Sequence, residues 1–79
     1  DLDFQDEIQE RMNLLTPRER DVLEMIAQGK LNKQIAFDLG ITQRTVEVHR
    51  ARVMEKMQAR TVADLLRTVM SLDTFARKP

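Results

Sequence analysis

The fold of this chain is decided by residues 41–57, which read ITQRTVEVHRARVMEKM. Apolar residues recur every three or four positions, as they do along an α-helix that turns by about 100° per residue. Val46, Val53 and Met57 therefore share an inward stripe, which His49 and Met54 flank. The opposite face carries Arg44, Val48, Ala51, Arg52 and Glu55, with Thr45 and Glu47 beside it. We predict one helix, residues 43–58, with a core face and an exposed face.

The composition of the exposed face suits the major groove of DNA. Arginine can donate to guanine O6 and N7, glutamate can accept from cytosine N4, and small apolar side chains can contact thymine methyl groups. On this ground Arg52 is a candidate base-reading residue. A helical adaptor that binds another protein can present the same face, so a protein-interaction module stays open as the alternative function.

The residues before this helix fit a helix-turn-helix unit, which we place at residues 32–51. Two helices that cross closely need a small residue at the contact, and Ala36 supplies it. The tight turn needs a residue that tolerates positive φ, which Gly40 supplies, and Val46 anchors the second helix inward. Ile35 and Leu39 add to the local core, as does Ile41.

Capping signals predict where the helices begin and end. Thr16 precedes Pro17 and can form a capping box with Glu19, so a helix is expected over residues 17–28 and closed by Gly29. Caps for the later helices are expected at Asn32, Thr42 and Thr61, the last paired with Asp64.

The chain ends carry weaker patterns. Phe4, Ile8, Met12 and Leu15 recur at helical spacing, which predicts a linker helix in residues 1–13, with a frayed terminus as the alternative. Residues 14–72 form the predicted domain. Residues 73–79 are a C-terminal tail, in which Phe75, like Leu72 before it, is expected to fold back. Strand signals are nearly absent, so the predicted fold class is all-α.

Composition narrows the functional classes. The chain has 79 residues, no cysteine, no tyrosine and one histidine, so one small domain without a metal, a cofactor or a catalytic site is expected. No apolar run approaches a membrane span, which favours a cytoplasmic protein without a membrane partner. The net charge is zero, yet residues 1–10 are acidic and residues 30–60 are locally basic, which points to an anionic partner.

Four polar residues have two interpretations. Lys33 and Gln34 begin the supporting helix, where side chains and free amides favour phosphate oxygens, but both also fit an ordinary surface. Arg50 is expected near the inward edge, with its guanidinium paired to an acid such as Glu19, rather than on a base. His49 is expected to be a boundary residue hydrogen-bonded to backbone or phosphate.

Residues 15–57, LTPRERDVLEMIAQGKLNKQIAFDLGITQRTVEVHRARVMEKM, resemble the LuxR-type helix-turn-helix domain. TVEVHR at residues 45–50 is similar to the FixJ-like branch of two-component response regulators. The resemblance implies a four-helix domain, here with an additional N-terminal linker helix. It also implies a third helix that enters the major groove and a fourth that forms the dimer contact on inverted half-sites.

Site residues follow from the same resemblance. The family's base-reading positions correspond to Glu47, Val48 and Ala51, and its phosphate-contacting positions to Lys33, Arg44, Thr45 and Lys56. The dimer face is expected at Val62, Leu66 and Met70, while Leu65 and Val69 close the core. The implied partners are double-stranded DNA, a second copy, a receiver domain of the parent chain and RNA polymerase, with activation as the expected output.

Overall fold

The computed structural model describes residues 2–72, with side chains described from residue 6 onward. In that region the regular structure is entirely helical, which confirms the all-α prediction. The chain order is α1 (Leu2–Asn13), α2 (Pro17–Ala27), α3 (Asn32–Leu39), α4 (Gln43–Lys56) and α5 (Val62–Met70).

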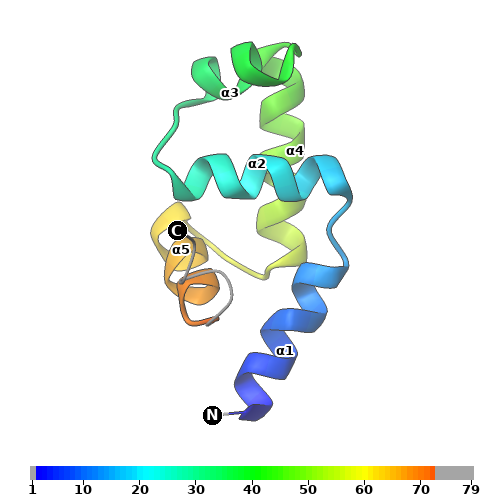
Figure 1. The fold of residues 1–79 in the computed structure, drawn as a ribbon, viewed down its shortest axis with the longest axis vertical. Coiled ribbons are helices and arrows are strands. Elements are labelled where there is room, and N and C mark those ends of the chain that lie inside the picture. Colours follow the sequence, from blue (N-terminus) through cyan, green and yellow to red (C-terminus); the bar gives the residue numbers. More distant parts are fainter. Residues whose placement is uncertain (1, 73–79) are drawn as a thin grey trace.

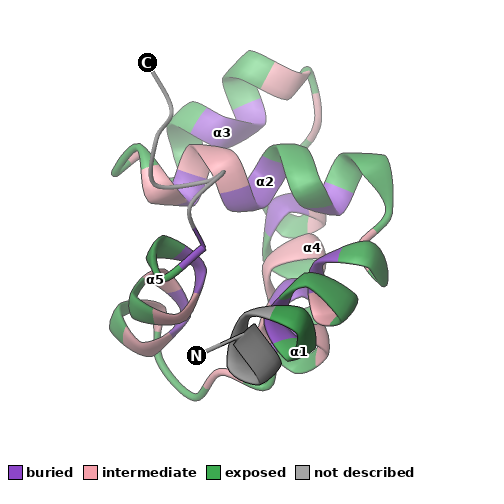
Figure 2. Ribbon diagram, turned by 60° about the horizontal axis from the view of Figure 1, so that its bottom comes forward, coloured by how far each residue is buried: buried purple, intermediate pink, exposed green. Residues whose placement is uncertain are grey.

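The helices pack around α4, the longest of the five described (Figure 1). Helix α2 crosses α4, α3 lies beside the N-terminal part of α4, and α5 lies beside its C-terminal half. Figure 2 shows that the buried residues of α2, α4 and α5 lie on the sides of these helices that face one another. The predicted inward stripe of α4 is confirmed, because Val46, Val53 and Met57 are all buried.

The capping residues act largely as the sequence predicts. The Thr16 hydroxyl accepts a hydrogen bond from Glu19 N, and the Glu19 carboxylate accepts one from Thr16 N, which completes the capping box. Thr42 caps α4 through Thr45 N, and Thr61 caps α5 through Asp64 N. These bonds satisfy amide groups that the helices leave without partners at their first turns.

Gly40 makes the turn between α3 and α4, as predicted. Its φ of 68° is left-handed and lets Ile41 N donate to Ala36 O at 3.0 Å. Ala36 is buried between the two helices. The small residue, the glycine and the buried Val46 therefore occupy the positions that a helix-turn-helix unit requires.

Two predicted helix ends are wrong. Leu31, not Asn32, occupies the N-cap position of α3, and Asn32 is the first helical residue. Helix α4 ends at Lys56 rather than at Gln58, because Gln58 adopts a left-handed φ of 56° and Ala59 N bonds back to Met54 O. A left-handed residue cannot continue a right-handed helix.

Helix α1 belongs to the core. Ile8 and Met12 are buried, and Leu15 packs partly against the same cluster, so this segment is not a frayed terminus. Leu72 is buried after α5, as expected. The prediction for Phe75 lies outside the described residues. Within residues 2–72, no helix is both long and apolar enough to cross a membrane.

Candidate nucleic-acid interface

Helix α4 presents one polar face to solvent. Every residue predicted for the outer face is exposed, and Val48 retains 44 % of its surface although it is apolar. The exposed residues are Arg44, Glu47, Val48, Ala51, Arg52 and Glu55. Because the opposite stripe of the same helix fills the core, this face is held rigidly in one orientation.

The N-terminal turn of α4 carries a second group of donors. The hydroxyl groups of Thr42 and Thr45 lie 3.0 Å apart, and Thr45 N donates to the Thr42 hydroxyl at 3.1 Å. Arg44 is exposed between them. A helix N-terminus carries partial positive charge, so this turn favours an anion such as a phosphate group.

The start of α3 is also built for anions, although the residues there share other tasks. Lys33 and Gln34 are both exposed. The Gln34 side-chain carbonyl accepts a hydrogen bond from Leu31 N at 3.0 Å and so helps to cap the helix. The amide group of Gln34 still carries two N–H donors. Lys30 is not available in the same way, because its ammonium pairs with Asp38 at 2.6 Å.

The C-terminal end of α4 is tied to α2 by a partly buried ion pair. Lys56 Nζ lies 2.7 Å from Glu19 Oε1 and also donates to Leu14 O at 3.1 Å. Glu19 is only 3 % exposed. Burial by itself raises the pKa of the Glu19 carboxyl, but the hydrogen bonds and charge of Lys56 and the bonds from Thr16 outweigh it, so the net pKa is lowered.

The predicted pairing of Arg50 with Glu19 is therefore wrong. Arg50 and Lys56 are six residues apart on α4, which is about 9 Å along a helix, and the start of α2 lies next to Lys56. Arg50 is half-buried, as expected for an inward edge, but it lines a groove between α4, α5 and the α2–α3 connection. His49 is half-buried as well, and its Nδ1 atom is buried with no hydrogen-bond partner among the described residues.

Helix α5 divides its apolar residues between the core and the surface. Leu65 and Val69 are buried, as predicted. Of the predicted dimer residues, Val62 and Leu66 are half-buried and Met70 is 43 % exposed. The three form an apolar stripe at intervals of four residues that the monomer leaves partly uncovered.

The sequence did not predict three of the large exposed apolar residues, Leu14, Leu31 and Phe37, and the last two lie in the α3 region. Phe37 on α3 is 86 % exposed and Leu31 is 70 % exposed. A signal for Leu31 was present, because a leucine occupies an N-cap position, where Ser, Thr, Asp or Asn is preferred. Phe37 carries no such local signal, since its exposure depends on which face of α3 meets α4.

Comparison with known proteins agrees with this architecture. The family model described as "Bacterial regulatory proteins, luxR family" matches residues 13–69. The transcriptional regulatory protein FixJ of Rhizobium meliloti is 46 % identical over 71 residues, which are 90 % of this chain and 35 % of that protein. The tetrathionate response regulatory protein TtrR of Salmonella typhimurium is 57 % identical over 53 residues, 67 % of this chain and 26 % of that protein.

A solved structure shares the fold. The response regulator StyR superposes with a TM-score of 0.82 at 42 % identity, over 85 % of this chain and 34 % of that one. The chain thus spans about a quarter to a third of the length of these relatives. It belongs to the luxR family of bacterial regulatory proteins, and the predicted LuxR-type helix-turn-helix domain of the response-regulator type is confirmed.

Proposed function

We propose that this chain is the sequence-specific DNA-binding output domain of a two-component transcriptional regulator, and that it binds inverted half-sites as a dimer with α4 in the major groove. The observation that carries the proposal is the exposed face of α4, which stands directly opposite a fully buried stripe. A rigid helix with one free face is the element that a major groove admits.

Base reading is assigned to four residues of that face. Arg52 donates to guanine, Glu47 accepts from cytosine N4, and Val48 and Ala51 pack against thymine methyl groups. Their exposure supports this assignment. Each good polar contact of this kind contributes about 1–3 kcal/mol of discrimination between bases.

Phosphate contacts are assigned to the two helix N-termini that flank the reading face. Arg44 and Thr45 at the start of α4, with Lys33 and Gln34 at the start of α3, position the domain on the duplex. Lys56, which the resemblance also implied, is left out of this set. Its ammonium is held by Glu19 and Leu14 O, so we assign it to orienting α4.

Dimerisation is assigned to the stripe of Val62, Leu66 and Met70. Two copies on an inverted repeat place the same helix face against itself, as a two-fold axis requires. The partial exposure of these residues supports the assignment. We further propose that a receiver domain of the parent protein either masks this domain or keeps it monomeric, and that phosphorylation of the receiver permits dimerisation on DNA. The bound dimer then activates transcription, in part through RNA polymerase.

The test is selection of duplexes from a random pool at low salt by the chain and by an Arg44→Ala, Arg52→Ala variant. Enrichment of an inverted repeat by the wild type, and its loss in the variant, is the expected result. A folded wild type that enriches no duplex at any salt concentration refutes DNA reading.

The second candidate function is a protein-interaction module, and Phe37 favours it. Phe37 is 86 % exposed, and aromatic residues are enriched in protein–protein interfaces. Salt separates the two functions. Binding through several phosphates weakens steeply as salt rises, whereas an apolar interface does not.

A further inference from the structure

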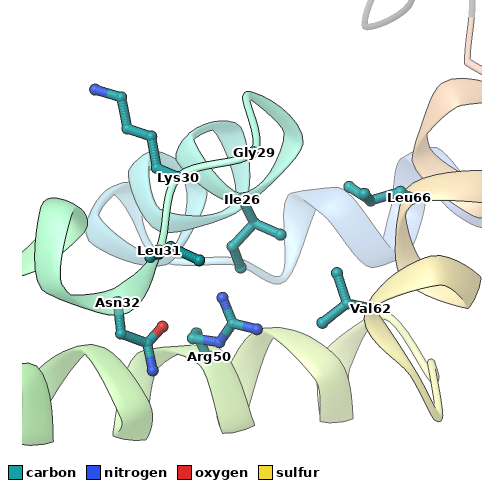
Figure 3. Close-up of a pocket in the computed structure, with 8 residues that line it drawn as sticks. All are labelled: Ile26, Gly29, Lys30, Leu31, Asn32, Arg50, Val62 and Leu66. Atoms are coloured by element: carbon teal, nitrogen blue, oxygen red, sulfur yellow. The ribbon is translucent and has the colours of Figure 1, made fainter.

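A shallow apolar groove borders the stripe of Val62, Leu66 and Met70. It has a volume of about 450 Å³ and lies between the start of α5 and the α2–α3 connection. Figure 3 shows Val62 and Leu66 on one side of the groove and Leu31 on the other, with Ile26 between them. The lining is mainly apolar, with two charged residues: Lys30, whose ammonium points away and pairs with Asp38, and Arg50, which rises into the groove from α4.

Leu31 is the least expected residue of this groove. It is 70 % exposed and stands at the N-cap of α3, where its side chain makes no capping hydrogen bond. A serine or aspartate at this N-cap would stabilise the helix, whereas leucine contributes no capping hydrogen bond and buries little surface within the monomer. Such departures occur where a residue serves an interaction.

Arg50 limits which partner can cover the groove, because that partner must supply hydrogen-bond acceptors. Within residues 2–72 the Arg50 guanidinium makes no hydrogen bond or ion pair. In Figure 3 the group points toward Ile26, with Leu31 on one side of it and Val62 on the other. An arginine that an apolar partner covers must find acceptors on that partner, because an unpaired buried charge is costly.

We infer that the groove receives the C-terminal turn of α5 from a second copy of this chain. The inference rests on the proposed function, because the inverted repeat brings the second copy. In a two-fold pair centred on Leu66, the two α5 helices run antiparallel, and Met70 of one copy lies opposite Val62 of the other. Met70 then enters the groove and packs against Leu31 and Ile26.

The backbone at the end of that turn matches Arg50, and the turn's own cation, Arg67, lies about 100° round the helix from Leu66. Carbonyl groups at the C-terminal end of a helix carry partial negative charge and accept hydrogen bonds from arginine. The size of a stable interface also favours a contact that includes the groove. The stripe on α5 offers three apolar side chains, whereas stable interfaces engage about 20–30 residues on each side, so a dimer contact has to spread onto neighbouring surface. The groove is apolar surface that adjoins the stripe.

The test compares Leu31→Ser with Phe37→Ser. Both variants remove an exposed apolar side chain from the α3 region, but Phe37 does not line this groove. Binding is measured on a pool-selected inverted repeat and on the same duplex with one half-site scrambled. Leu31→Ser is expected to raise the thermal midpoint by about 4 °C through better capping. It is also expected to weaken cooperative binding to the repeat about tenfold, without changing binding to the single half-site.

Phe37→Ser is expected to leave the cooperativity between half-sites unchanged. Equal cooperativity in wild type and Leu31→Ser, with half-site binding intact, overturns the groove contact and leaves DNA reading standing. Failure of the wild type to bind any duplex refutes the proposed function instead.

Cross-linking tests the contact without depending on DNA affinity. The chain has no cysteine, so single thiols can be introduced without background. A Leu31→Cys chain mixed at high concentration with a Met70→Cys chain is expected to give a covalent dimer with a short bismaleimide. A Phe37→Cys chain in place of Leu31→Cys is expected to give none. Equal cross-linking by both mixtures contradicts the inference.

Discussion

Replacement of Glu19 by glutamine is expected to destabilise the domain, and the loss is expected to disappear in acid. Glu19 is the buried residue that ties the start of α2 to the end of α4, through its 2.7 Å contact with Lys56. Glutamine keeps an acceptor for Thr16 N, so the capping box survives and the charge alone is removed.

The size of the loss follows from these contacts. A hydrogen bond to a charged group contributes about 1.5–3 kcal/mol, and a neutral one contributes roughly half as much. Glu19→Gln should therefore cost about 1 kcal/mol at pH 7, which lowers the thermal midpoint of a domain of this size by about 4–8 °C. Glu19→Ala also removes the capping bond, which adds about 0.5–2 kcal/mol.

The pH dependence has a definite sign. The pKa of Glu19 in the folded chain is lowered from 4.5, so the folded state favours the charged form. Its contribution to stability is present above the unfolded pKa and is lost as the pH falls through the folded pKa. The difference between wild type and Glu19→Gln should thus be full at pH 7 and shrink progressively below pH 4.5.

Urea unfolding followed by circular dichroism at 222 nm, at a series of pH values, measures this difference. Glu7→Gln is the matched control, because Glu7 is exposed and its pair with Arg11 lies on the surface of α1. That variant should change stability by a few tenths of a kcal/mol at most. A Glu19→Gln variant as stable as the wild type at pH 7, or a deficit that persists unchanged in acid, refutes the reasoning.

Three further results are expected. Gly40→Ala should lower the free energy of unfolding by about 1 kcal/mol, because its φ of 68° is strained for alanine although the space around it is open. Gln58→Gly should raise the free energy of unfolding by about 0.5–1 kcal/mol, because Gln58 also has a left-handed φ. Urea unfolding must give opposite signs for the two variants. Thr42→Ala should lose about 1 kcal/mol with the cap of α4, and Thr42→Ser should restore most of it. Arg44→Ala should reduce the salt slope of DNA binding by about 0.9, while Lys56→Met should leave the slope unchanged; an equal reduction in both makes Lys56 a phosphate contact.

Local signals in the sequence determined the helices and their faces. A capping threonine is read from its own neighbours, and so is a glycine at a left-handed turn, because the bonds involved join residues three to five positions apart. Helical periodicity placed Val46, Val53 and Met57 in the core for the same reason, and it placed the proposed reading face opposite them. The predicted start of α3 and end of α4 were wrong because a non-preferred residue stands there: Leu31 is the N-cap of α3, and Gln58 adopts the left-handed conformation after α4.

The tertiary structure alone decided the long-range partners. The sequence offered Glu19 several cations, and only the crossing of α2 over α4 selected Lys56, which is 37 residues away, instead of Arg50. The same packing left Arg50 in a groove whose walls come from α2, α5 and the α2–α3 connection. Which ionic groups meet depends on where two helices cross, and that is set by the fit of whole apolar faces rather than by any short pattern.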